Sequence, residues 1–122
     1  KEQAQSISPM RDAIDRGLHP TNHTDFYVAP LDQMFMLWSA VNRISRGGAE
    51  VGLDQRVTPL EGLKAMTIWG AEQYGEQDSK GSLEPGSHAD FAAYDTDPFT
   101  AQTLDGIAPV LTVSLGREVF AR

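Results

Sequence analysis

The hydrophobic pattern of the chain changes near residue 75, and this change limits the fold more than any other feature of the sequence. Before it, apolar residues recur every three or four positions, which is the period of an amphipathic helix. After it, turn-forming residues separate short runs of the kind that form strands. Helices followed by strands, without an internal repeat, predict an α+β fold.

The first part of the chain contains two helix signals before residue 50. Residues 9–16 follow Ser8, which we expect to be the N-cap, with Pro9 at the first helical position and a stop at Gly17. The segment 30–48, PLDQMFMLWSAVNRISRGG, predicts the strongest helix, ending at its two glycines. Its apolar stripe comprises Leu31, Met34, Phe35, Leu37, Trp38, Val41 and Ile44. We interpret this stripe as core packing rather than as a ligand groove.

A third helix is predicted over residues 58–75. Thr58 and Glu61 have the spacing of a capping box, and Pro59 suits the first helical position. The residues expected on its buried face are Leu60, Leu63, Met66, Ala71 and Tyr74.

The end of the chain has strand and turn signals. DFAAYD, residues 90–95, predicts a strand, and residues 109–122 predict a hairpin with Gly116 at the first turn position. Pro85 and Gly86 predict a type II turn. Three residues are expected to share one face of the hairpin: Leu111, Val113 and Leu115.

Charge and composition exclude several classes of protein. Ten basic against 17 acidic residues give a net charge of −7, without a basic run, so we expect no nucleic-acid partner. No apolar run is long enough to cross a bilayer, so we expect no membrane association. There is no cysteine, which excludes disulfides and thiolate metal sites and fits a cytoplasmic location.

The segment LHPTNHTDFYVAP, residues 18–30, holds two of the three histidines and Asp25. His19 and His23 have the four-residue spacing of helical zinc peptidases, but Pro20 lies between them and no glutamate follows His19, which excludes that motif. Two readings remain open: an ordinary polar turn, or a metal centre to which Asp25 contributes one ligand. A carboxylate at the C-terminal end of a strand is where parallel α/β barrels place catalytic groups.

Three stretches together resemble the amidohydrolase superfamily. GSLEPGSHADFAAYDTDPF, residues 81–99, is similar to the signature at which such enzymes leave the barrel for a small β-sandwich. HTDFYVAPLDQMFMLWSAVNR, residues 23–43, and DQRVTPLEGLKAMTIWGAEQYG, residues 54–75, resemble the last barrel strand and the closing helices of the subgroup that includes N-substituted formamide deformylases.

The resemblance implies a role for Asp25. In the family, the aspartate at the end of the eighth strand contacts a divalent metal, for which we expect zinc, and takes a proton from the attacking water. The resemblance thereby implies hydrolysis of a C–N bond in a small-molecule amide, formamide or cyclic amide. His23, two residues earlier, would lie on the same strand face and bind substrate. Asp90 belongs to the structural signature and is not a catalytic candidate.

The family's other metal ligands are absent, and a complete barrel needs about 250 residues. We therefore expect a C-terminal fragment of a longer enzyme, with residues 1–80 completing a TIM barrel and residues 81–122 ending its β-sandwich. Such a fragment should be inactive alone, bind metal weakly and self-associate through exposed apolar faces. The alternatives are a non-catalytic α+β interaction or regulatory domain that kept the family sequence, and a small-molecule binding module.

Overall fold

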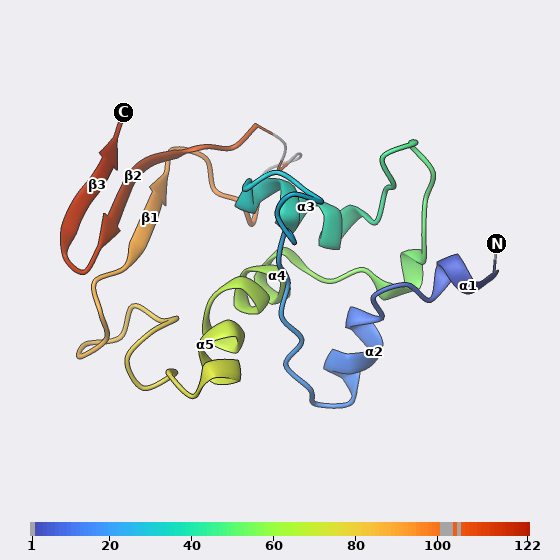
Figure 1. Cartoon of the computed structure of the whole chain (residues 1–122), viewed down its shortest axis with the longest axis horizontal. Helices are drawn as coiled ribbons and strands as arrows, with labels where there is room; N and C mark the ends of the chain where they lie inside the picture. The colour runs from blue at the N-terminus through green and yellow to red at the C-terminus, as the bar shows by residue number, and fades with distance from the viewer. Residues whose placement is uncertain (1, 101–103, 105) are drawn as a thin grey trace.

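The computed structural model describes residues 2–100, 104 and 106–122. Helices occupy the first part and strands the last, which confirms the α+β prediction (Figure 1). In chain order the elements are α1 (Glu2–Gln5), α2 (Met10–Asp15), α3 (Gln33–Asn42), the 3₁₀ helix η1 (Leu53–Gln55), α4 (Pro59–Met66), α5 (Ile68–Tyr74), β1 (Phe91–Tyr94), β2 (Pro109–Ser114) and β3 (Arg117–Ala121). The sheet lies at one end of the molecule and the helices fill the rest (Figure 1).

The capping box predicted for the third helix is confirmed, but the helix is divided. The hydroxyl of Thr58 accepts the N–H of Glu61 at 3.2 Å, and the Glu61 carboxylate accepts the N–H of Thr58 at 2.8 Å. Thr67 then leaves the helical region, with φ −126° and ψ −100°, and its hydroxyl donates to the carbonyl of Leu63 at 2.7 Å. A threonine that bonds back to the preceding turn bends a helix. Residues 59–74 therefore form α4 and α5 instead of one helix.

The predicted end of the second helix was wrong. Its last residue is Asn42, and Arg43 adopts a left-handed conformation with φ 58°. The Arg43 Nε donates to the carbonyls of Val51 and Gly52 at 3.0 and 3.2 Å. These bonds join Arg43 to residues beyond the glycine pair, and Ile44 pairs with Glu50 in an antiparallel bridge. Gly47 and Gly48 therefore lie in the turn between the paired segments and do not end the helix.

The predicted start of α2 was also wrong. Pro9 occupies the N-cap position and Ser8 precedes it with φ 50°, so that no side chain among the described residues caps this helix. Its end before Gly17, which has φ 75°, is as predicted. The carbonyl of Ser8 accepts the N–H of Met10 at 2.8 Å, which closes a tight turn ahead of the helix.

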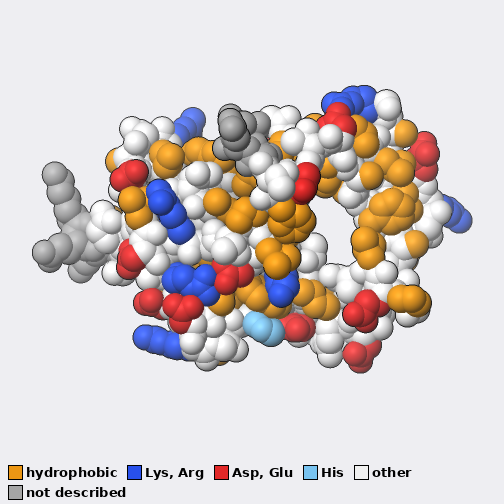
Figure 2. Space-filling view, turned by 180° about the vertical axis from the view of Figure 1, so that it is seen from behind, with side chains coloured by type: hydrophobic (Ala, Val, Ile, Leu, Met, Phe, Trp, Pro, Cys, Tyr) orange, Lys and Arg blue, Asp and Glu red, His pale blue; other side chains and the backbone are white. Residues whose placement is uncertain are grey.

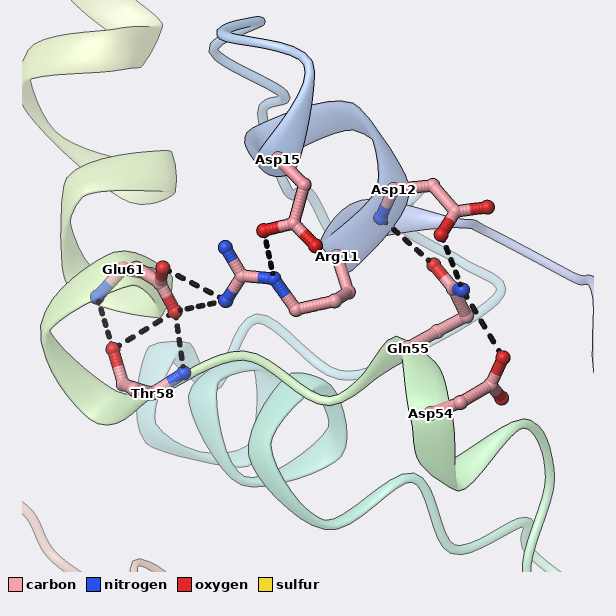
Figure 3. Close-up of polar contacts among 7 residues, drawn as sticks. All are labelled: Arg11, Asp12, Asp15, Asp54, Gln55, Thr58 and Glu61. Atoms are coloured by element: carbon pink, nitrogen blue, oxygen red, sulfur yellow. Dashed lines mark hydrogen bonds and ion pairs between the residues drawn. The ribbon is translucent and has the colours of Figure 1, made fainter.

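Polar contacts fasten α2 to α4 and η1 (Figure 3). Arg11 Nη1 donates to both carboxylate oxygens of Glu61 at 2.8 Å, and its Nε donates to Asp15 at 2.8 Å. Gln55 is 5% exposed, accepts the N–H of Asp12 at 3.1 Å and donates to its carboxylate at 3.0 Å. Because Gln55 has partners for both ends of its amide, its burial carries no unsatisfied polar group.

Two apolar clusters form the core of the described residues. One consists of Met10, Ala40, Val57, Ala65 and Trp69. The other consists of Met34, Leu37 and Leu104, with partly buried side chains packed against it, namely Trp38, Val41, Leu63, Met66, Tyr94 and Ile107. The second cluster joins α3 to β1 through Tyr94.

Several residues predicted to be buried are exposed. Leu31 is 68% exposed and Ile44 is 37% exposed because both lie outside the shorter α3. Leu60 is 50% and Tyr74 is 79% exposed, and Trp69 occupies the buried face of α5 in place of Tyr74. The buried residues of α4 are Gly62 and Ala65, and those of α5 are Trp69 and Ala71, so, apart from Ala71, the prediction took the wrong face of the helical pattern.

The described strands form an antiparallel sheet in the order β1-β2-β3. The predicted hairpin is present, but its turn is Leu115 and Gly116, with φ 48° and 74°, so glycine takes the second position and not the first. A two-residue turn with positive φ at both positions matches the twist of paired strands. Leu115 is consequently 69% exposed and does not share a face with Leu111 and Val113.

The type II turn is confirmed. Gly86 has φ 102°, and the N–H of Ser87 donates to the carbonyl of Glu84 at 3.1 Å.

Seen from behind, hydrophobic side chains border an opening between the sheet and the helices (Figure 2). None of the helices in the described ranges has the length and apolar character needed to cross a bilayer.

Candidate functional site

The segment that leads to Asp25 is anchored on α5. The His19 ring stacks on Trp69, with centroids 4.8 Å apart and planes 8° from parallel, and its Nδ1 pairs with the Glu72 carboxylate. The Thr21 hydroxyl donates to the Gln73 side chain at 2.8 Å. These contacts attach residues 19–21 to one short helix, α5.

The same segment then passes between α4 and α3. The N–H of Asn22 donates to the carbonyl of Ala65 at 3.3 Å, and its amide Nδ2 lies 3.4 Å from the carbonyl of Met36. Thr24 is buried. Residues 18–24 belong to none of the strands of the described sheet. The backbone N–H of Asn22 is hydrogen-bonded to α4 instead of to a neighbouring strand. A barrel strand at this position therefore stays a prediction.

Asp25 lies at an exposed corner of the chain. It has φ 47°, its N–H donates to Nδ1 of His23 at 3.0 Å, and its carbonyl accepts the N–H of Val28 at 2.6 Å. The N–H of Ala29 closes the corner by donating to the carbonyl of Thr24 at 3.2 Å. The structure thus brings His23 and Asp25 together, through a turn rather than along one face of a strand.

Hollows lie on both sides of this corner. A groove of about 810 Å³ is lined by four aromatic residues, Phe26, Tyr27, Phe35 and Trp38, and its lining also includes Arg46. Phe26 stacks on Tyr27 with centroids 4.5 Å apart, and Phe35 stacks on Trp38 with centroids 6.0 Å apart. Sequence reasoning assigned Phe35 and Trp38 to the core. The sequence analysis missed this groove, and the aromatic dipeptide directly after Asp25 is the signal that could have indicated it.

A second cleft, of about 480 Å³, opens beside His23. Its polar lining includes Asn22, Gln73 and Thr21, and its apolar lining comes from α4 and α5. His23 and Asp25 are both exposed. Asp25 itself lines neither hollow, but the residues around it do, His23 the cleft and Phe26 the groove.

The side chains present do not form a metal centre by themselves. In the ranges 2–100, 104 and 106–122, no three His, Asp or Glu side chains gather closely enough to hold an ion. His19 is engaged by Glu72, and His88 follows the type II turn, in a separate part of the chain. A catalytic zinc ion needs three protein ligands. Asp25 as a metal ligand therefore stays a prediction.

Comparisons with known proteins give a consistent assignment. The model of the amidohydrolase family matches residues 1–120. The N-substituted formamide deformylase of Arthrobacter pascens is 30% identical over 97 residues, covering 80% of this chain and 18% of the relative. The imidazolonepropionase of Solibacter usitatus is 32% identical over 91 residues, covering 73% of this chain and 19% of the relative.

Among solved structures, an amidohydrolase from Thermotoga maritima MSB8 aligns with a TM-score of 0.70 at 22% identity. The alignment covers 93% of this chain and 26% of that structure. The chain spans about a fifth of the length of the curated relatives it matches, namely 18% of one and 19% of the other.

Proposed function

The chain belongs to the amidohydrolase family, and on that premise we propose that it contributes Asp25 to a site that hydrolyses a C–N bond in an amide, formamide or cyclic amide. The observation that carries the proposal is the exposed corner at Asp25, flanked in the chain by His23, which lines the polar cleft, and by Phe26, which lines the aromatic groove. The name of the Arthrobacter relative, which describes removal of a formyl group from an N-substituted formamide, supports the choice of bond.

Asp25 would act as the general base and then the general acid of the reaction. Its carboxylate takes a proton from water as the water oxygen bonds to the carbonyl carbon, and returns a proton to the nitrogen as the C–N bond breaks. The proton balance needs one carboxylate on the side of the carbonyl from which water attacks. The exposed corner leaves the Asp25 carboxylate accessible for that contact.

A divalent metal, with zinc as the proposed ion, is the cofactor expected for such a site. The described side chains do not fit a metal centre alone. Asp25 is the one donor that we assign to it, and the other ligands would come from outside these 122 residues. The division into a barrel portion, residues 1–80, and a sandwich portion, residues 81–122, is likewise part of the proposal.

The groove supports a substrate with an apolar group beside the scissile bond. Pockets that bind small molecules are mostly apolar, measure about 300–1,000 Å³ and carry a few polar groups. The groove of about 810 Å³ has this character, and Phe26 at its wall directly follows Asp25. We place the apolar group of the amide in this groove.

The test is turnover by the complete gene product that contains this chain, assayed on a panel of formamides and amides after loading with zinc. Asp25→Asn keeps the size of the side chain and removes the base, so kcat should fall by about 10²- to 10⁴-fold. Asp78→Asn, in the exposed turn after α5, is the matched control and should leave kcat unchanged. Unchanged turnover of Asp25→Asn would overturn the proposal and favour a non-catalytic interaction or regulatory domain.

A further inference from the structure

The backbone of Asp25 adopts a conformation that a side-chain-bearing residue takes only when its surroundings hold it there. Its φ of 47° lies in the left-handed region, where Cβ crowds the following carbonyl. Aspartate tolerates this region better than most residues but does not favour it. Residues held in such conformations are common where a functional side chain must point in one direction.

Three hydrogen bonds hold the corner. Two come from the downstream side: Val28 N–H to the carbonyl of Asp25 at 2.6 Å, and Ala29 N–H to the carbonyl of Thr24 at 3.2 Å. The third comes from the upstream side, where Nδ1 of His23 accepts the N–H of Asp25 at 3.0 Å. This third bond occupies the only donor of the Asp25 backbone, and it is the one bond of the three that a side chain supplies.

We propose that His23 is a positioning residue that fixes the left-handed corner and thereby the direction of the Asp25 carboxylate. This inference rests on the catalytic role proposed above for Asp25. It differs from the substrate-binding role that the sequence suggests for His23, because the ring acts through the Asp25 backbone and not on the substrate. A ring whose Nδ1 accepts a hydrogen bond carries no proton on that atom.

Replacing His23 by asparagine separates the positioning role from a direct role of the imidazole on the substrate. An asparagine oxygen accepts the N–H two residues ahead in an Asx turn, which is the same bond that His23 makes. His23→Asn therefore keeps the acceptor and removes the imidazole, whereas His23→Ala removes both. His88→Ala, which removes an exposed histidine in another turn, is the control for loss of a ring.

The experiment uses the zinc-loaded complete gene product and has two readouts. The first is hydrogen–deuterium exchange in overlapping peptides that differ by the amide of Asp25. The second is kcat and KM on the substrate that the wild-type protein turns over fastest. Misplacement of a catalytic group by about 1 Å costs about 10²-fold in rate, so kcat of His23→Ala should fall about 10- to 100-fold while KM stays within about twofold.

The expected pattern is that exchange at Asp25 accelerates in His23→Ala and stays slow in His23→Asn and His88→Ala, with kcat following the same order. If exchange in His23→Ala matches that of wild type, His23 does not hold the corner. If His23→Asn loses as much kcat as His23→Ala while its exchange stays slow, the imidazole itself acts and the positioning role is wrong.

Should His23→Ala fail to fold, His23→Asn still decides, because the proposal requires it to retain both slow exchange and kcat. Failure of the proposed function is distinguishable from these outcomes. Unchanged turnover of Asp25→Asn would show that Asp25 has no catalytic role. Exchange at the Asp25 amide would still report whether His23 holds the backbone of the corner.

Discussion

The guanidinium Nη1 of Arg11 lies 2.8 Å from both carboxylate oxygens of Glu61, and this contact joins α2 to the first turn of α4. The same carboxylate completes the capping box with Thr58. One glutamate thus both starts a helix and fastens another to it. Burial alone would raise the pKa of Glu61, but the Thr58 N–H and the Arg11 guanidinium outweigh burial and hold that pKa below its ordinary value.

The lowered pKa of Glu61 predicts a loss of stability in acid. A carboxyl with a folded pKa below its unfolded value contributes stability above the unfolded value, about 4.5, and loses that contribution as the pH falls through the folded pKa. Glu61→Gln should be less stable than wild type at pH 7, and the difference should shrink below pH 4.5. Urea unfolding across this pH range measures both effects.

Glu84→Gln is the matched control, since Glu84 lies exposed beside the type II turn. Its free energy of unfolding should follow that of wild type at every pH. A Glu61→Gln protein whose deficit stays constant down to the acid-unfolded state would contradict the role given to the Glu61 charge.

Gly62 is predicted to be required by helix packing. A Cβ at this position would lie 2.4 Å from Cδ1 of Leu37, whose side chain is 0% exposed. Alanine normally favours a helix over glycine by about 1 kcal/mol, but overpacking a core costs about 1–3 kcal/mol. We expect Gly62→Ala to lower the free energy of unfolding by about 1 kcal/mol in urea denaturation.

Gly70 provides the opposite case on α5. No described atom outside its own helix and chain neighbours lies within 4 Å of the position a Cβ would take. Gly70→Ala should therefore gain the helix propensity and raise the free energy of unfolding by about 0.5–1 kcal/mol. Equal effects of the two substitutions would show that α3 and α4 do not pack as closely as the structure has them.

Local signals in the sequence predicted the helices and strands but not where two of the helices break or end. The capping box of Thr58, the type II turn at Gly86 and the strands depend on neighbouring residues, so they could be recognised from spacing alone. The end of α3 is accompanied by bonds to residues that fold back, such as Arg43 to Val51, and no local pattern carries that information. The break at Thr67 involves a bond within the helical turn, to the carbonyl of Leu63, but the continuous apolar pattern gave no sign of it.

The candidate site shows the same division. Asp25 was singled out by its family motif, and that assignment stays a prediction. Its left-handed corner could not be predicted, because the extended segment before it gives no sign of a reversal at Asp25. The aromatic groove needed the turn that brings Phe26 and Tyr27 beside α3.

Arg43 is predicted to hold the N-terminal segment against the body. Its guanidinium donates to the carbonyls of Ser8 at 3.1 Å and Ile7 at 2.5 Å, in addition to those of the loop after α3. Lysine keeps the charge but lacks the planar fork that reaches several carbonyls at once. Arg43→Lys should lower the free energy of unfolding by about 1–2 kcal/mol and speed proteolysis before residue 9.

Arg46→Lys, in the exposed loop that follows, is the control and should alter neither stability nor the rate of cleavage. Faster cleavage in Arg43→Lys at sites far from the N-terminal segment would indicate general unfolding instead of a lost tether.

Self-association of the isolated 122-residue chain is predicted from its exposed apolar side chains. Tyr27 is 90% exposed, Val28 81% and Phe26 55%, and these neighbours form one apolar wall of the groove. A continuous apolar patch of this kind seldom remains free in water, because covering it removes apolar surface from solvent. Light scattering after size exclusion should give a mass above the 13.3 kDa of one chain.

Val28→Asp should shift that mass toward one chain, whereas Val119→Asp on β3, 61% exposed and outside the groove, should shift it less. A wild-type chain that stays monomeric at high concentration would contradict the prediction.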